Sequence, residues 1–226
     1  MTIWQMSAWK LLMSGGPVMI PIIFCSFFAL AIIIEKFLYF ASISIDIKQF
    51  KETIFEHIKA NNIKEAIGAC DANPSPLAKV LKAGILKFGS SRDEIKESME
   101  DESFLEIPKL ERKLTALATI ANITPLLGLL GTVTGIAGSF HAIQMRTNSL
   151  NPVSPGDLAG GIWEALITTI AGLMIAIPSF VTYNYFVSRV HLFTLEMERG
   201  ATELLTLMSY VSESKTIKKG NYQVEV

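Results

Sequence analysis

Three long apolar runs, separated by segments rich in charged residues, dominate the pattern of the chain. They cover residues 18–40, 114–144 and 162–187. Each run exceeds the ~20 residues with which an α-helix crosses ~30 Å of hydrocarbon at ~1.5 Å per residue. No stretch alternates between apolar and polar residues as a half-buried strand would. The pattern therefore predicts an all-α membrane protein with three transmembrane helices.

The segments between the runs complete the predicted organisation. We expect residues 1–17 to form an outer-face leader, 41–113 a cytoplasmic helical domain, 145–161 an outer loop, and 188–226 a cytoplasmic C-terminal helix and tail. In the leader, Trp4 and Trp9 fit either an amphipathic helix at the outer surface or an unstructured segment.

The first run is expected to be a retained span. It ends in Glu35 and Lys36 rather than in the small residues of a signal-peptide cleavage site, and only Lys10 precedes it as a positive charge. The helical pattern after Glu94 runs through Lys109 and Arg112 straight into the second run. Long helices are therefore expected to extend from the membrane into the cytoplasmic helical domain.

Lysine and arginine set the predicted orientation. The leader and the outer loop each contain one basic residue, Lys10 and Arg146, whereas the segment 41–113 and the C-terminal tail contain many. Positive residues are enriched on the cytoplasmic side of membrane proteins. We therefore expect the N-terminus outside and the C-terminus inside.

Helix-start residues divide the segment 41–113 into four helices. The predicted starts follow Asp46, Asn62, Ser75 and Ser91, with Pro76 at the first position of the third helix. We expect this third helix to end at Gly89. The fourth is expected to run through Arg112 into the second span without a break, with Pro108 as the site of a kink.

Composition excludes several classes of function. Half of the residues are hydrophobic and 18% are charged, against roughly 25% charged in soluble domains. The net charge of −1 offers no basic surface for nucleic acid. Cys25 and Cys70 lie in different segments, so we expect no disulfide, and no Cys and His group has metal-ligand spacing. Without a set of nucleophile, base and orienting group or a phosphate-binding loop, we expect neither enzymatic activity nor a cofactor.

Polar residues inside the second and third runs are the candidates for function. They are Asn122, Thr124, Thr132, Thr134, Glu164, Thr168 and Thr169. Such groups are costly in lipid and normally face a bundle interior or a water-filled path. A threonine hydroxyl can line a proton path or contact a helix, although it can also bond its own backbone. Glu164 lies ~15 Å from the middle of its run, so a snorkelling interfacial acid is the alternative to a functional one.

Small residues line one face of each of these two runs. In the second run this face contains Gly128 and Gly135, with Gly131 beside it, and in the third it contains Gly172. Small residues let helices pack closely, and we expect Gly128 and Gly135 to form the contact between subunits. Pro125 and Pro178 also lie within the spans, where each removes a backbone donor and can kink its helix.

No acid, histidine or lysine lies near the middle of any run. The chain therefore has hydroxyl groups but no titratable group at mid-membrane. If protons move through it, a partner is expected to supply the carboxylate.

Two motifs resemble the ExbB/TolQ/MotA proton-channel family. They are the runs Pro-Leu-Leu-Gly-Leu-Leu-Gly-Thr-Val-Thr-Gly at 125–135 and Gly-Ile-Trp-Glu-Ala-Leu-Ile-Thr-Thr-Ile-Ala-Gly-Leu at 161–173. The order of three spans with a large inner segment is similar to ExbB and TolQ rather than to four-span MotA.

The resemblance implies a homopentameric ring in the bacterial inner membrane, with the outer loop in the periplasm. Spans two and three would enclose the helix of an ExbD- or TolR-like single-span partner, with Thr132 and Thr169 facing the pore and Glu164 at its outer part. The proton-motive force would then energise outer-membrane transport or envelope maintenance, through a TonB-like or envelope-spanning protein. The alternative is a non-conducting membrane scaffold subunit, and the choice between H⁺ and Na⁺ stays open.

Overall fold

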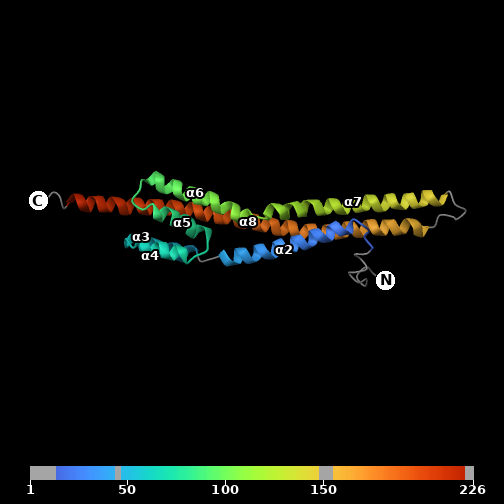
Figure 1. Ribbon diagram of the computed structural model, residues 1–226, viewed down its shortest axis with the longest axis horizontal. Helices are drawn as coiled ribbons and strands as arrows, with labels where there is room; N and C mark the ends of the chain where they lie inside the picture. Colours follow the sequence, from blue (N-terminus) through green and yellow to red (C-terminus); the bar gives the residue numbers. More distant parts are fainter. Residues whose placement is uncertain (1–13, 44–46, 148–154, 222–226) are drawn as a thin grey trace. The chain divides into compact units, whose positions relative to one another are not determined.

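The computed structural model describes residues 14–43, 47–147 and 155–221 of the chain (Figure 1). Its helices are α2 (Met19–Ile43), α3 (Ile47–Lys59), α4 (Ile63–Asp71), α5 (Pro76–Leu86), α6 (Arg92–Glu111), α7 (Leu114–Thr147) and α8 (Pro155–Asn221). No strand occurs in these described ranges, and the predicted all-α fold is confirmed. The predicted leader helix up to residue 13, the Asp46 cap and residues 148–154 of the outer loop lie outside the described residues.

Three stretches of the chain are long and apolar enough, by length and composition, to cross a membrane. They are carried by α2, α7 and α8, as the apolar runs predict. Helix α8 has 67 residues and so measures ~100 Å at ~1.5 Å per residue. A single crossing needs only about 20 of these residues, so most of α8 is available for other contacts.

The chain divides into two compact units. The unit called here the span unit contains the described residues up to Lys36 together with Lys113–Phe186. The other, called here the helical unit, contains Phe37–Arg112 and the chain from Val187 onward.

Within the helical unit, the helix starts lie where the capping residues predict them. The hydroxyl of Ser75 accepts a hydrogen bond from Ala78 N at the start of α5, and Ser91 accepts one from Glu94 N at the start of α6, both at 3.3 Å. These side chains satisfy backbone donors that have no partner inside the helix. Asn62 occupies the N-cap position of α4 without a side-chain hydrogen bond.

The helices of this unit enclose an apolar core. The side chains that are fully buried include Ile54, Ile58, Leu77, Leu81, Ile85, Met99, Met197 and Leu204. They come from α3, α5, α6 and α8. Gly84 lets α5 approach closely, because a β-carbon at this position would lie 2.9 Å from Met99 Cγ and 3.0 Å from Leu204 Cδ2.

Two predicted helix boundaries are wrong. Helix α5 ends at Leu86 rather than at Gly89, which has φ +93° in the turn that follows. More importantly, the helix after Ser91 does not run unbroken into the second span: α6 ends at Glu111 and α7 begins at Leu114. Pro108 lies inside α6, before this break.

The break between α6 and α7 escapes sequence analysis for a physical reason. Leu110, Leu114 and Leu117 are all buried and keep helical spacing across it, so the apolar period shows no interruption. The backbone departs from the helix at Arg112, with ψ 133°, and at Lys113, with φ +67°. Lys113 also forms an ion pair with Glu35, a long-range contact that local sequence cannot reveal.

A buried carboxylate connects α5 to α6. The Glu106 side chain is 1% exposed and accepts hydrogen bonds from Lys79 at 2.9 Å and from Lys109 at 2.5 Å. Burial alone would raise the pKa of Glu106, but the hydrogen bonds from Lys109 and Lys79 outweigh it and lower the pKa below its usual value. Its contribution to stability is therefore present above the ordinary glutamate range, and is lost as pH falls through the lowered pKa.

We predict that Glu106→Gln destabilises the protein by about 1–2 kcal/mol at neutral pH, because two charge-assisted hydrogen bonds to a buried group are weakened. Both lysines are about half exposed, so water can solvate them in the variant. The matched control is Glu100→Gln, also on α6, whose pair with Lys96 is exposed and 3.5 Å long. Thermal unfolding in detergent at pH 7 should separate the two variants, and equal midpoints would contradict the prediction.

Candidate functional site

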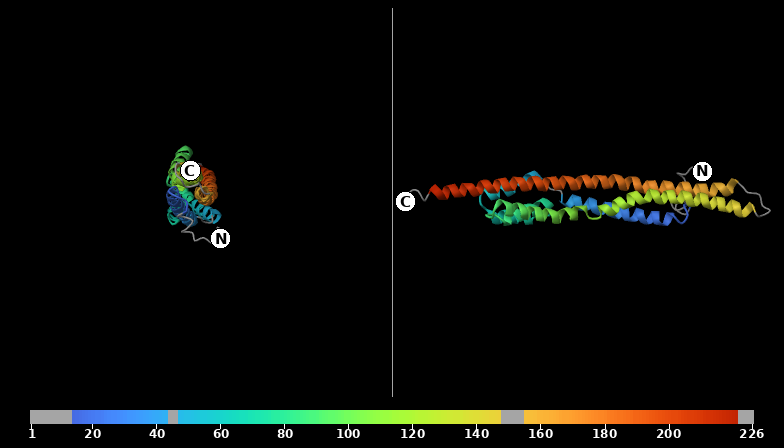
Figure 2. Two further views of the ribbon diagram at one scale, coloured as in Figure 1. Left: turned by 90° about the vertical axis from the view of Figure 1, so that its right-hand side faces the viewer. Right: turned by 90° about the horizontal axis from the view of Figure 1, so that it is seen from above.

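The span unit depends on close packing between α7 and the part of α8 before Val187, which lie side by side in both views (Figures 1 and 2). A β-carbon on Gly128 would lie 3.1 Å from Thr169 Cα, and one on Gly172 would lie 2.8 Å from Thr124 O. A β-carbon on Gly135 would lie 2.8 Å from Gly161 O. All of these neighbours are backbone atoms, which cannot rotate away.

This geometry corrects one expectation about assembly. Gly128 and Gly135 were expected to form the contact between subunits. Both are buried against α8 of the same chain. The close approach that glycine permits is therefore used inside the subunit, and a contact between subunits must use another surface.

Thr168 fills the space that Gly131 leaves open. The Thr168 side chain is fully buried, and its Cβ lies 2.5 Å from where a β-carbon on Gly131 would be. Its hydroxyl donates to Ala165 O at 2.8 Å and Glu164 O at 3.2 Å in its own helix. Sequence analysis named Thr168 only among the polar residues of the span. The family resemblance implied a role for its neighbour Thr169 alone, and nothing local indicated that Thr168 would fit against Gly131 of α7.

Thr169 connects α8 to α7 through a hydrogen bond. Its hydroxyl donates to Gly128 O at 3.1 Å and also to Ala165 O of its own helix at 3.2 Å. In a regular α-helix the amide of Thr132 donates to that same Gly128 carbonyl. The Thr132 hydroxyl donates to Leu129 O at 2.6 Å. The two threonines thus converge on one carbonyl, and no hydrogen bond joins their side chains in the described part of the chain.

Helix α2 packs on α8 beside this contact. Met19, Ile22 and Ile167 form a buried apolar cluster, against which Trp163 and Leu127 also pack. The start of α2 is thereby held close to the turns of α8 that contain Trp163 and Ile167.

Glu164 borders a cavity of ≈ 490 Å³ in the span unit. The cavity is lined by Pro17, Val18, Thr134, Gly135, Gly138, Ser139, Ala142, Gly161 and Glu164. The glutamate is half-buried, and no described residue donates a hydrogen bond to its carboxylate. Two hydroxyl groups, those of Thr134 and Ser139, share the cavity with it. This is the place in the span unit where a carboxylate and hydroxyls meet at an accessible space.

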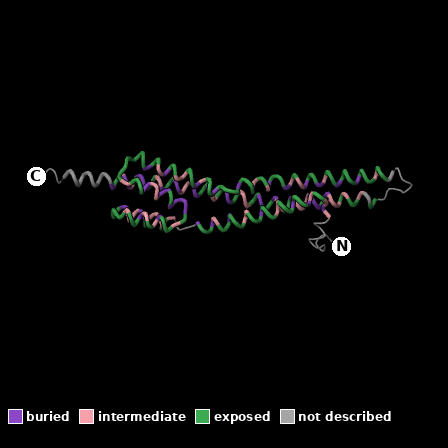
Figure 3. Tube along the Cα trace, in the orientation of Figure 1, coloured by how far each residue is buried: buried purple, intermediate pink, exposed green. Residues whose placement is uncertain are grey.

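Much of the remaining surface of the span unit is apolar. Exposed side chains follow α2 and α7 (Figure 3), and the large hydrophobic ones include Phe24, Phe27, Leu126, Leu129 and Met174. Such a surface suits lipid or neighbouring transmembrane helices. Pro125 is half-buried within α7, and Pro178 is exposed within α8.

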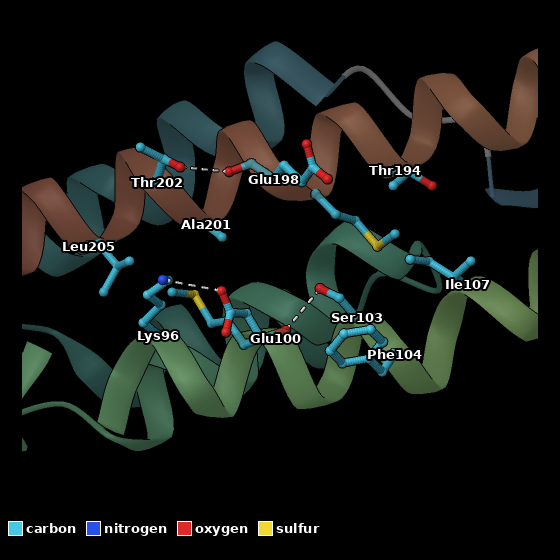
Figure 4. Close-up of a pocket in the computed structure, with 12 residues that line it drawn as sticks. Lys96, Glu100, Ser103, Phe104, Ile107, Thr194, Glu198, Ala201, Thr202 and Leu205 are labelled. Atoms are coloured by element: carbon cyan, nitrogen blue, oxygen red, sulfur yellow. Dashed lines mark hydrogen bonds and ion pairs between the residues drawn. The ribbon is translucent and has the colours of Figure 1, made fainter. Parts of the chain in front are cut away.

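The helical unit contains a second hollow, a groove of ≈ 410 Å³ between α6 and α8 (Figure 4). The polar side chains that line it interact within their own helices. Lys96 pairs with Glu100, Ser103 donates to Met99 O, and Thr202 donates to Glu198 O. None of these interactions converges on the space between the helices. The groove therefore lacks the converging polar groups of a ligand site.

Comparison with known proteins now identifies the class of protein. Residues 72–199, more than half of the chain, match the MotA/TolQ/ExbB proton channel family. The chain is 30% identical over 175 residues to the biopolymer transport protein ExbB-like 3 of Synechocystis sp., an alignment that covers 77% of this chain and 82% of that protein. The chain therefore belongs to the MotA/TolQ/ExbB proton channel family.

Two further relatives represent the ExbB and TolQ branches. The chain is 35% identical to the biopolymer transport protein ExbB of Salmonella typhimurium, over 58% of each protein. It is 31% identical to the Tol-Pal system protein TolQ of Pseudomonas aeruginosa, over 62% of this chain and 64% of that protein. The chain thus spans less than two thirds of these two relatives.

The packing of α7 on α8 makes opposite predictions for two glycines of α8. We predict that Gly172→Ala destabilises the protein by about 1–3 kcal/mol, because its methyl group would collide with backbone of α7. Gly160→Ala has open space within 4 Å, and alanine is favoured over glycine in a helix by about 0.5–1 kcal/mol. Thermal unfolding in detergent should show the midpoint falling for the first variant and not for the second. A midpoint for Gly172→Ala at or above that of the parent would contradict the contact.

Proposed function

We propose that the chain is the ring-forming subunit of a proton-driven motor of the ExbB/TolQ type in the bacterial inner membrane. Copies of the chain, five by the family resemblance, would surround the single transmembrane helix of an ExbD- or TolR-like partner. The ring would use the proton-motive force to energise outer-membrane transport or envelope maintenance. A TonB-like or envelope-spanning protein would receive the output.

The observation that carries this proposal is the environment of Glu164. A half-buried carboxylate, without a hydrogen-bond donor among the described residues, borders a cavity shared with Thr134 and Ser139. A glutamate that only anchored the helix end would extend its charge into the surrounding water. An ionisable group that instead lines an open cavity between the helices of a membrane protein favours an ion path.

The hydrogen bonds of the threonines define what they can offer a proton carrier. A hydroxyl has one proton to donate and two lone pairs that accept. The hydroxyls of Thr132, Thr134 and Thr169 each donate to backbone carbonyls of the chain. They are therefore available chiefly as acceptors. Acceptors stabilise a protonated species, such as a hydronium ion or the neutral acid of a partner carboxyl group.

A partner must supply the carboxyl group at mid-membrane. Glu164 is the only carboxylate between Leu158 and Val187, and the second apolar run has none. A partner helix with an aspartate or glutamate at mid-membrane would complete a path that begins at Glu164. Each proton that crosses 100 mV releases ~2.3 kcal/mol, so several protons can drive a conformational cycle.

The proposed orientation follows from the same assignment. With the N-terminus in the periplasm and the C-terminus in the cytoplasm, Glu164 faces the side from which protons enter. The basic residues of the segment 41–113 then lie in the cytoplasm, as the distribution of positive charge favours.

The first functional prediction concerns Thr169. Valine is close to threonine in shape but lacks the hydroxyl, so Thr169→Val should preserve the ring and the bound partner. The variant loses one hydrogen bond of the Thr169 hydroxyl, which is worth about 1–1.5 kcal/mol. Proton flux should therefore fall about tenfold. The measurement is proton flux into liposomes that contain the chain with its ExbD- or TolR-like partner, read with an enclosed pH-sensitive dye under an imposed potential. Ring recovery is measured by native mass spectrometry.

The matched control is Thr119→Val in α7. The Thr119 side chain is exposed, and its hydroxyl donates to Thr115 O within its own helix. We expect parental flux from it. A scaffold subunit would show no potential-driven flux above protein-free liposomes. Parental flux from Thr169→Val with an intact ring would remove Thr169 from the proton path.

A further inference from the structure

A turn of two glycines precedes α2 and lies against Glu164. Gly16 has φ +63°, and its carbonyl accepts a hydrogen bond from Met19 N at 3.1 Å, which starts the helix. Side chains are strained in this left-handed region of the backbone, whereas glycine is not. The conformation of the turn therefore already favours glycine at position 16.

The Glu164 carboxylate occupies the space that a side chain at position 16 would fill. A β-carbon on Gly16 would overlap Glu164 Oε1 and lie 2.8 Å from Glu164 Cδ. The carboxylate thus rests on the bare backbone of the turn. Any side chain at position 16 would have to displace it.

The same turn covers the next helical turn of α8. A β-carbon on Gly15 would lie 3.2 Å from Thr168 Cγ2 and 2.7 Å from Met19 Cε. Thr168 is therefore enclosed between Gly15 on one side and Gly131 of α7 on the other. Thr168 lies one helical turn after Glu164. The glycine turn therefore contacts two successive turns of the outer part of α8, at Glu164 and at Thr168.

We propose that Gly16 is a positioning residue for Glu164: because it has no side chain, it leaves room for the carboxylate to lie against the turn at the wall of the cavity. A glutamate side chain at the end of a span otherwise extends toward water. The turn before α2 thereby makes the first span part of the proton-entry site, although that span contributes no titratable group to it. This inference rests on the proposed function of Glu164 as the outer group of the proton path.

The test is a double-mutant cycle between positions 16 and 164, made in the full-length chain. Gly16→Ala should displace the carboxylate into the cavity. Reaction of Glu164 with a water-soluble carbodiimide and an amine, followed by mass spectrometry, should then be several-fold faster than in the parent. Proton flux with the partner should fall about tenfold, because a misplacement of about 1 Å is enough for losses of this size.

Glu164→Asp provides the rescue. Its side chain is one methylene shorter, so its carboxylate carbon would take the place of Glu164 Cγ, 3.4 Å from the β-carbon position of residue 16, and the close overlap with Glu164 Oε1 is relieved. In the Glu164→Asp background, Gly16→Ala should therefore cost less thermal stability and less flux than in the parent background. Coupling of this kind reports direct contact.

Gly16→Asn is the second variant, since asparagine tolerates the left-handed conformation and retains the collision with the carboxylate.

Gly89→Ala in the helical unit is the control for backbone strain alone. Gly89 has φ +93° and open space within 4 Å of its β-carbon position. Its effect should be the same with Glu164 or Asp at position 164.

The outcomes separate this inference from the proposed function. Parental carbodiimide labelling and parental flux in Gly16→Ala and Gly16→Asn would overturn the positioning role. So would a failure of Glu164→Asp to restore recovery of folded protein if Gly16→Ala prevents folding. Parental flux in Glu164→Gln would instead overturn the proposed function, while coupled labelling and stability would still support contact between Gly16 and Glu164.

Discussion

The contact between α7 and α8 through glycine is the constraint on which the rest of the span unit depends. Where Gly128, Gly135 and Gly172 face the other helix, a single methyl group would collide with its backbone. Only at this short separation can the Thr169 hydroxyl reach a carbonyl of α7. Since lipid offers helices no hydrophobic drive to associate, such packing and hydrogen bonding must hold them together.

The packing of the helices also determines the surroundings of Glu164. The carboxylate cannot be surrounded by lipid at acceptable cost, and α7 with the turn before α2 provides a cavity instead. Most other charged groups of the described chain lie outside the apolar runs, where some form ion pairs such as Lys51 with Glu203. In the proposed motor, this division leaves one carboxylate to receive protons at the outer side, while the partner provides the next.

Local sequence was informative wherever the structure depends on neighbouring residues. The apolar runs predicted three spans, and Pro76 and Ser91 predicted helix starts, because the signals that start a helix lie within its first turn. The break between α6 and α7 was missed, since the leucine spacing continues across it and its backbone turn accompanies a distant ion pair. The glycine face was recognised as a packing surface, but it was assigned to the wrong neighbour.

The sequence by itself determined the fold class, the number of spans, and the set of polar residues inside them. These follow from hydrophobicity, helical period and capping, which act over a few residues, and the family motifs added the class of protein. Only the tertiary structure decided that α8 of the same chain packs on the glycine face of α7. It also decided that Thr168 is buried, that the Thr169 hydroxyl donates to a carbonyl of α7, and that Gly16 contacts Glu164. These contacts join residues from different helices, and their geometry depends on how closely backbones approach, which no local pattern encodes.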